Sequence, residues 1–299
     1  MYEEVQLNIY NVSDDMMMKL KGLFELMRFE LPFAAGICVI LGQLFALGFF
    51  APFTLSLLAF FSVFTISASI LVLNDYLDLE TDIINAPQRP IPSGIVSKKE
   101  SLLLTVLLIF FGLYFSYLIS IIAFATIIFL LIIGNLYNRF FKKSGLLGNL
   151  IVSISVGMTF IFGGISVGEP FNKTVIFFAL IAALIDLGEE IAADAMDIEG
   201  DKLINSKSIA IKYGRVKAVK TSSIIFSIVL LLSPVPFFLG WFSFIYLIPI
   251  GIMNLFILYS TIKLIKSQQN SEGRKFIRLL YIGSTFGLVI FLVMKMLKL

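Results

Sequence analysis

Two short acidic segments of the chain repeat one spacing of carboxylates, D-x-x-D-x-x-x-D. The repeated acids are Asp75, Asp78 and Asp82 in NDYLDLETD, and Asp194, Asp197 and Asp201 in DAMDIEGD. If each segment is helical, the acids of each fall on one face; Asn74 joins the first row and Glu190 joins the second. Such rows of hard oxygen ligands suit Mg²⁺, which often shares its coordination with substrate phosphates. The spacing therefore predicts two facing rows that hold divalent cations on a diphosphate.

Acids at helix ends are often merely solvated, so one Asp alone carries no argument. Here, however, ten of the 20 acidic residues lie within 75–82 and 189–201 of a very apolar chain. We therefore expect the seven residues of the two rows to form the metal site: Asn74, Asp75, Asp78, Asp82, Asp194, Asp197 and Asp201. Within it we assign the catalytic role to Asp78, Asp82, Asp197 and Asp201. Glu80, Glu189 and Glu199 lie off these rows and are expected to point outward, away from the site.

Basic side chains are needed to contact the diphosphate oxygens that the metal ions do not bind. The segment INAPQRPIPSG follows the first motif, and its prolines favour a structured loop from which Arg89 reaches a phosphate. We expect substrate contacts from Arg89, from Tyr137, Arg139, Lys142 and Lys143 in YNRFFKK, from Glu190, and from Lys202 after the second motif. Basic residues also set membrane orientation, and we assign that role to Lys98, Lys217 and Lys220.

The composition predicts an all-α membrane protein. Of 299 residues, 59% are hydrophobic and 14% are charged, whereas a soluble domain carries about a quarter charged residues. We expect nine transmembrane helices with cytoplasmic cap loops. Their approximate ranges are 29–49, 54–74, 101–118, 121–139, 147–167, 173–193, 218–237, 241–263 and 276–297.

The distribution of Lys and Arg predicts the orientation of these spans. With the N-terminus inside, 20 of the 23 basic residues fall in inner segments, as the positive-inside rule requires. Both acidic motifs then lie on the cytoplasmic face of a multi-pass protein of the cell membrane. We expect residues 1–28 to be a cytoplasmic tail with an interfacial segment, without a cleavable signal peptide, and residues 29–299 to be one transmembrane domain.

The positions of the motifs predict an internal repeat. One motif ends the second span and the other ends the sixth, so an even number of spans separates them. The chain therefore returns to the same face, which indicates two parallel four-helix halves with a ninth helix appended.

Several kinds of chemistry are excluded. The chain has no histidine, and its single cysteine, Cys38, lies in an apolar run. This excludes a disulfide framework, a zinc site of His and Cys, and His-based acid–base catalysis. No residue is identified as a dedicated general base.

These segments resemble the UbiA superfamily of membrane prenyltransferases. The matching segments, in order, are NDYLDLETD with RPIPSG, YNRFFKK with GN, and DAMDIEGDK with SIAIKYG. The resemblance implies Mg²⁺-dependent transfer of a prenyl group from a prenyl diphosphate. It also implies that Asn74, Asp78, Asp197 and Asp201 are the principal metal-site residues, supported by Asp75, Asp82 and Asp194. It adds Arg28 to Arg89 and Lys142 as a contact to the diphosphate.

The chain departs from the family pattern at two positions. The pattern Tyr-x-x-x-Lys would place a lysine at position 141, where this chain has Phe141, and Lys142 comes one residue late. Ser208 stands where Thr is common, which is a mild change.

The segments FIFGGISVG and LLSPVPFFLG most resemble the archaeal members that alkylate the hydroxyl of geranylgeranylglyceryl phosphate with geranylgeranyl diphosphate. That acceptor needs a second cationic pocket, for which Arg28 is a candidate. The alternative acceptor is aromatic, such as hydroxybenzoate or a quinone precursor. A protein of another class, a cation transporter, fits less well, because transporters usually place ionisable groups near the bilayer midplane.

Overall fold

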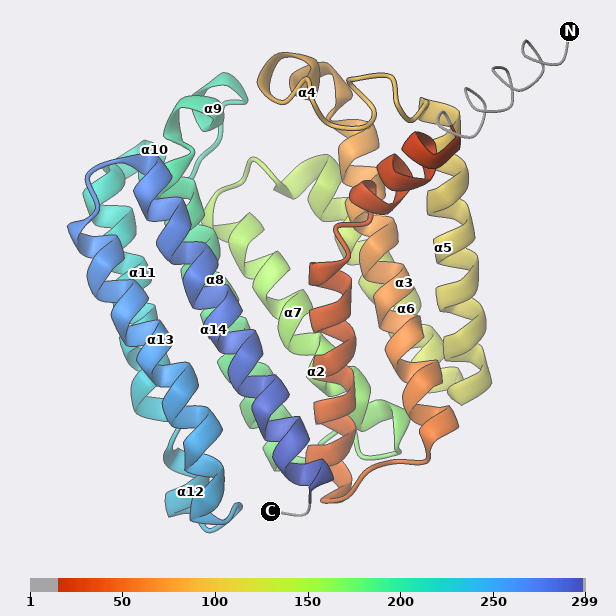
Figure 1. Ribbon diagram of the computed structural model, residues 1–299, viewed down its shortest axis with the longest axis vertical. Helices are drawn as coiled ribbons and strands as arrows, with labels where there is room; N and C mark the ends of the chain where they lie inside the picture. The colour runs from red at the N-terminus through yellow and green to blue at the C-terminus, as the bar shows by residue number, and fades with distance from the viewer. Residues whose placement is uncertain (1–15, 298–299) are drawn as a thin grey trace, which may run out of the picture.

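The computed structural model describes residues 16–297, and the regular elements within that range are helices (Figure 1). The long ones are α2 (Glu30–Leu47), α3 (Phe53–Leu77), α5 (Lys98–Ile119), α6 (Ile121–Leu136), α7 (Leu146–Ser166), α8 (Lys173–Met196), α11 (Arg215–Leu232), α13 (Leu247–Lys266) and α14 (Asn270–Met296). The short ones are α4 (Leu79–Asn85), the π-helix η1 (Tyr137–Phe141), α9 (Ile198–Leu203), α10 (Ile209–Tyr213), α12 (Val235–Phe238) and the 3₁₀-helix η2 (Phe244–Tyr246). A further helix covers 16–26. The predicted tail within 1–15 lies outside the described residues.

Most long helices can cross a membrane, which confirms the polytopic all-α class. Within residues 16–297, eight helices are long and apolar enough to do so. Helix α8 is not among them, although it has 24 residues. Any 18-residue stretch of α8 contains Asp186, Glu189 and Glu190, whose charge lowers its hydropathy. Because α8 packs between α7 and α11, a ninth span remains consistent with the bundle.

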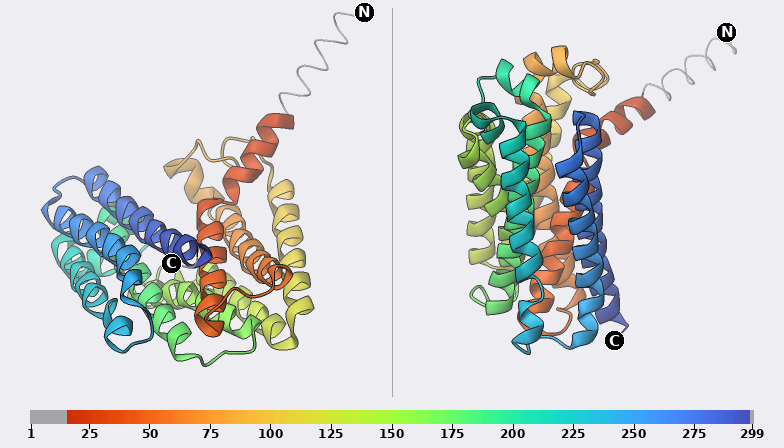
Figure 2. Two further views of the ribbon diagram at one scale, coloured as in Figure 1. Left: turned by 60° about the horizontal axis from the view of Figure 1, so that its bottom comes forward. Right: turned by 90° about the vertical axis from the view of Figure 1, so that its left-hand side faces the viewer.

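The helices repeat one packing order in the two halves of the chain. In the first half α2 packs on α3, α3 on α5, and α5 on α6; in the second, α7 packs on α8, α8 on α11, and α11 on α13. Helix α14 is added against α13 and α8. The short helices α4 and α9, which follow α3 and α8, lie at the same end of the bundle in Figures 1 and 2. This is the expected parallel repeat with one helix appended.

The halves meet where α2 crosses α7, and small residues allow this close contact. A Cβ atom on Gly42 would lie 2.3 Å from the Phe160 carbonyl oxygen, and one on Gly163 would lie 2.3 Å from the Val39 carbonyl oxygen. The Gln43 amide donates a buried hydrogen bond of 2.8 Å to the Ser166 hydroxyl nearby. Close backbone approach of this kind is typical of helix pairs in membranes.

Some predicted helix boundaries differ from the observed ones. The apolar stretch 101–139 divides as expected, and Ser120 caps α6 by accepting a hydrogen bond from the Ala123 N–H. The predicted span 218–237 lies within the candidate span Arg215–Phe238, but Pro234 and Pro236 interrupt its helix after α11 and leave the separate turn α12. The next long helix, α13, accordingly starts later than the predicted residue 241.

Candidate active site

Both acidic motifs interrupt a helix, so the prediction of continuous helical rows was wrong. Helix α3 ends at Leu77, and Asp78 has φ −85° and ψ 2° before α4 begins. Helix α8 likewise ends before Asp197, which has φ −112° and ψ 15°. Aspartate is a poor helix former, so a break at the middle acid is locally favoured. The third acid of each motif therefore lies on a separate short helix, α4 or α9.

The first motif is held by two arginines. The Asp75 carboxylate accepts a hydrogen bond of 2.6 Å from Arg28, and it lies 3.5 Å from Arg89. Arg89 also donates to Asp82 at 2.6 Å. Burial opposes the positive charge of Arg89, but the hydrogen bond and the charges of these acids outweigh it and raise the pKa of the guanidinium. The loop between α4 and α5 thus folds back onto the motif.

Arg28 has an unusual backbone. Its φ is +46°, and Asn205 is the other non-glycine residue with a positive φ among the residues described. A long side chain in this left-handed region costs energy, so the surrounding contacts must hold it there. The kink lies between helix 16–26 and α2 and directs the Arg28 guanidinium to Asp75.

Lys142 reaches the first motif from the loop between the halves. Its ammonium donates to the Asn74 amide oxygen at 3.0 Å and forms an ion pair with Asp78. The segment before it is the π-helix η1, in which the Lys142 N–H bonds the Tyr137 carbonyl oxygen, five residues earlier. A π-turn contains one more residue than an α-turn. Lys142 therefore takes the place, one turn beyond Tyr137, that residue 141 would have in an α-helix.

The second motif has mostly neutral partners. Asp194 accepts a hydrogen bond of 2.9 Å from the Asn149 amide on α7, whereas Asp197 pairs with Arg274 on α14. Burial raises the pKa of the Asp201 carboxyl, against the hydrogen bonds from Ser208 and Ser206 and the charge of Lys142. The Oδ2 atom of Asp201 is buried and finds no hydrogen-bond partner among the described residues.

A line of acids continues from this motif along α8. Asp186, Glu190 and Asp194 recur every fourth residue, and Asp186 accepts a hydrogen bond of 3.0 Å from Ser153 on α7. The Tyr137 hydroxyl lies within electrostatic range of Glu190 and Asp194, and also of Asp78 in the first motif.

The prediction that Glu189 points outward was wrong. Its Oε1 atom is buried and has no hydrogen-bond partner in the part of the chain that the structure describes. The reason is that α8 is covered by helices on several sides, including α7, α11 and α14. Glu80 and Glu199, by contrast, are exposed as expected.

Three of the predicted substrate contacts are exposed side chains. Arg139 is exposed and lies over the Phe140 ring, 5.8 Å from its centroid. The side chains of Lys143 and Lys202 are also exposed. Lys143 instead contributes its backbone carbonyl, which accepts a 3.0 Å hydrogen bond from the Lys207 N–H. That bond joins the loop after η1 to the loop after α9.

Sequence reasoning missed three residues that the fold brings to the acids: Asn149, Asp186 and Arg274. In the sequence, Asn149 belongs to the matching segment GN and Arg274 is one of the inner basic residues, and neither position indicates a role. Asp186 had a signal of its own, since an ionisable residue within an apolar helix is costly and often functional.

The donor atoms of the motifs suit Mg²⁺, although they are not preassembled around one point. No three carboxylates within the described residues lie close enough together to hold one metal ion. Mg²⁺ typically uses one or two carboxylates together with phosphate oxygens and water. The unpartnered Oδ2 of Asp201 and the oxygen-only donor set meet that requirement.

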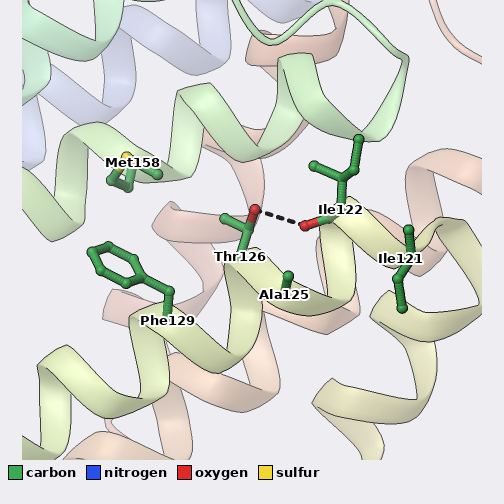
Figure 3. A pocket seen from close by; sticks show the side chains of 6 residues that line it. All are labelled: Ile121, Ile122, Ala125, Thr126, Phe129 and Met158. Atoms are coloured by element: carbon green, nitrogen blue, oxygen red, sulfur yellow. Dashed lines mark hydrogen bonds between the residues drawn. The ribbon is translucent and has the colours of Figure 1, made fainter.

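A separate hollow of about 440 Å³ lies between α6 and α7 (Figure 3). Its lining is Ile121, Ile122, Ala125, Thr126, Phe129 and Met158. The one hydroxyl there, on Thr126, donates to the Ile122 carbonyl oxygen at 2.8 Å. Without a charged group, this surface has no means of holding a diphosphate.

Comparison with known proteins identifies the family of this chain. The model of the UbiA prenyltransferase family matches residues 35–285. A digeranylgeranylglyceryl phosphate synthase of Methanocaldococcus jannaschii is 35% identical over 93% of this chain and 97% of its own length. The corresponding protein of Methanococcus aeolicus is 37% identical over 84% of this chain and 89% of its own.

Solved structures show the same fold. A structure from work on digeranylgeranylglyceryl phosphate synthase in membranes is 33% identical, covers 94% of this chain and 99% of its own, and has a TM-score of 0.72. A UbiA homologue of Archaeoglobus fulgidus, solved with DMAPP and Mg²⁺, is 18% identical, covers 91% of this chain and 99% of its own, and has a TM-score of 0.65. With the family model matched over most of the sequence, the chain belongs to the UbiA prenyltransferase family and is a multi-pass membrane prenyltransferase.

Proposed function

We propose that this enzyme transfers a geranylgeranyl group from geranylgeranyl diphosphate to the free hydroxyl of geranylgeranylglyceryl phosphate. The product carries the second ether bond of an archaeal membrane lipid. One observation carries the proposal from the structural side: Lys142 contacts Asn74 and Asp78 of the first motif, and its charge also acts on Asp201 of the second. The names of the relatives that match nearly the whole chain support the choice of acceptor.

Mg²⁺ would be held by the two motifs. Asn74, Asp78, Asp197 and Asp201 provide the principal oxygen donors, supported by Asp75, Asp82 and Asp194. When bound, the metal neutralises charge on the diphosphate as it leaves. The A. fulgidus homologue solved with a prenyl diphosphate and Mg²⁺ supports this assignment.

The basic residues orient the diphosphate. Arg28, Arg89 and Lys142 already lie beside the first motif, where they are placed to donate to phosphate oxygens. The Tyr137 hydroxyl lies within electrostatic range of Glu190 on α8 and of acids in both motifs. Charge held in this fixed arrangement stabilises the leaving group and favours ionisation of the allylic C–O bond. The acceptor hydroxyl then forms the new C–O bond and releases its proton.

The bundle supplies the lipid environment of the reaction. Both motifs lie at one end of helices that span the membrane (Figure 1). The excess of Lys and Arg at that end supports a cytoplasmic active site in the cell membrane. Residues 29–299 act as one transmembrane domain in this proposal.

The test is prenyl transfer by purified protein from radiolabelled geranylgeranyl diphosphate to geranylgeranylglyceryl phosphate, with Mg²⁺ and with EDTA. Metal-dependent product is expected with the lipid phosphate. Product formed only with hydroxybenzoate would show that the acceptor is aromatic instead. The absence of product with any acceptor would overturn the proposal.

A pair of variants locates the reaction at the motifs. Asp78→Asn should lower turnover by at least about a hundredfold, a loss typical for removal of a group that stabilises the transition state. Glu80→Gln, an exposed acid two residues away, is the matched control and should retain turnover. Equal turnover in the two variants would argue against the assigned site.

A further inference from the structure

The first motif is electrically balanced by side chains of the protein itself. It contributes three carboxylates, and three basic side chains among the described residues contact them. The pairs are Arg28 with Asp75, Arg89 with Asp75 and Asp82, and Lys142 with Asp78. The basic members come from three separate segments: the kink before α2, the loop after α4, and the loop after η1. None of them is the chain neighbour of its partner, so the fold has assembled this neutral cluster.

We propose that these three basic side chains are exchangeable counter-ions, so that divalent metal and diphosphate each bind the first motif more tightly when the other is present. In the exchange, Arg28, Arg89 and Lys142 pass from carboxylate to phosphate oxygens, and the released carboxylates become available to the metal. This inference rests on the proposed function, because it concerns the order of binding at the same site.

The carboxylates of these ion pairs are largely buried, and their basic partners are 31–37% exposed. The side chains of Asp75, Asp82 and Asp78 are 5%, 11% and 22% exposed. Charge-assisted hydrogen bonds to such carboxylates are stronger than neutral ones, and breaking a buried pair leaves an uncompensated charge. A cation that approaches the neutral cluster alone gains little attraction and must displace a guanidinium. A diphosphate removes this obstacle, because it gives the basic groups a new anionic partner.

Within the described residues, the second motif has no comparable cluster. Arg274 pairs with Asp197, but the two side chains are 57% and 42% exposed, and exposed pairs contribute little. The hydrogen-bond partners of Asp194 and Asp201 are the neutral Asn149, Ser206 and Ser208, and Lys142 acts on Asp201 through its charge without an ion pair. The exchange is therefore confined to the first motif.

The direct test measures metal binding without diphosphate, with Mn²⁺ as the probe and electron paramagnetic resonance as the readout. Arg89→Gln should bind Mn²⁺ about tenfold more tightly than the wild type, equivalent to about 1.4 kcal/mol. The matched control is Lys99→Gln, which removes an exposed charge in the first turn of α5. Unchanged or weaker binding by Arg89→Gln, or an equal gain by Lys99→Gln, would overturn the exchange.

The reciprocal test removes the acidic partner. Asp75→Asn should bind geranylgeranyl diphosphate in EDTA about tenfold more tightly than the wild type, because Arg28 is released while Arg89 keeps its bond to Asp82. If Arg89→Gln does not fold, Lys142→Gln takes its place in the Mn²⁺ titration with the same expectation. Unchanged diphosphate binding by Asp75→Asn would also overturn the exchange. If the wild type is active in the prenyl-transfer assay, that result would leave the proposed function intact. If the wild type is inactive, the proposed function itself would be wrong.

Discussion

The Lys142 ammonium donates a 3.0 Å hydrogen bond to the amide oxygen of Asn74, although 68 residues separate them. The bond joins the loop between the halves to the first acidic motif. It depends on the π-helix η1, which is itself fixed to α3 by the Asn138 amide, a donor to the Ile70 carbonyl oxygen at 3.0 Å. The extra residue in the π-turn is thus what brings a lysine at position 142 to the motif.

Exchanging the two residues at the end of this turn tests the register. The double variant Phe141→Lys, Lys142→Phe keeps the composition and net charge but moves the ammonium by one position. We expect KM for the prenyl diphosphate to rise about tenfold or more, because a charge-assisted contact is lost. Steady-state kinetics at saturating Mg²⁺ measures this, with thermal unfolding as the check on folding. An unchanged KM would show that the register is not fixed by η1.

The sequence could predict the helices but not this register. Apolar runs and the distribution of Lys and Arg are properties of whole segments, so they indicate where spans lie. A π-turn has no pattern of its own in one sequence. From the sequence, Lys142 therefore lies one residue beyond the family position. In the structure its N–H donates to the Tyr137 carbonyl oxygen five residues earlier, which accounts for the extra residue.

Arg28 offers a test of backbone strain that is separate from charge. Both Arg28→Ala and Arg28→Gly remove the ion pair with Asp75, but only glycine adopts φ +46° without cost. Arg28→Gly should therefore be more stable than Arg28→Ala by about 1 kcal/mol. The measurement is thermal unfolding of the two variants in the same detergent. The reverse order would mean that the kink relaxes once the ion pair is gone.

Gly145 tests how the second motif is connected to the loop between the halves. Its φ is +70°, and a Cβ atom there would lie 2.2 Å from the Lys207 carbonyl oxygen. Gly94 is a matched control, since its φ is +79° but nothing lies within 4 Å of its added Cβ. Gly145→Ala should be less stable than Gly94→Ala by about 1–3 kcal/mol, a typical cost of overpacking. It should also lower turnover, and equal effects of the two variants would argue against the contact.

The sequence did not predict the partners of the acidic side chains where those partners depend on how helices pack in the fold. The spacing of the acids was visible, and so was the proximity of Arg89 along the chain. Arg274, however, reaches Asp197 only because α14 packs against α8, and no local pattern encodes that pairing. Glu189 was assigned an outward direction from helical geometry alone, which fails for a helix with neighbours on several sides.

The Asp201 carboxyl links stability to metal binding. Burial raises its pKa, so between its ordinary pKa and the raised value the folded state binds more protons than the unfolded state. Stability therefore falls as pH rises through that interval, and above it the ionised carboxylate carries its full desolvation cost. Asp201→Asn removes this cost while keeping an oxygen that can accept the Ser208 hydrogen bond.

We expect Asp201→Asn to unfold at a higher temperature than the wild type in EDTA at neutral pH. The difference should shrink as the pH is lowered and the wild-type carboxyl takes up a proton. Addition of Mg²⁺ and prenyl diphosphate should stabilise the wild type more than the variant, because a ligand stabilises only the state that binds it. A variant that is less stable than the wild type in EDTA would show that the carboxylate is held by its hydrogen bonds instead, and equal stabilisation by the ligands would remove Asp201 from the metal site.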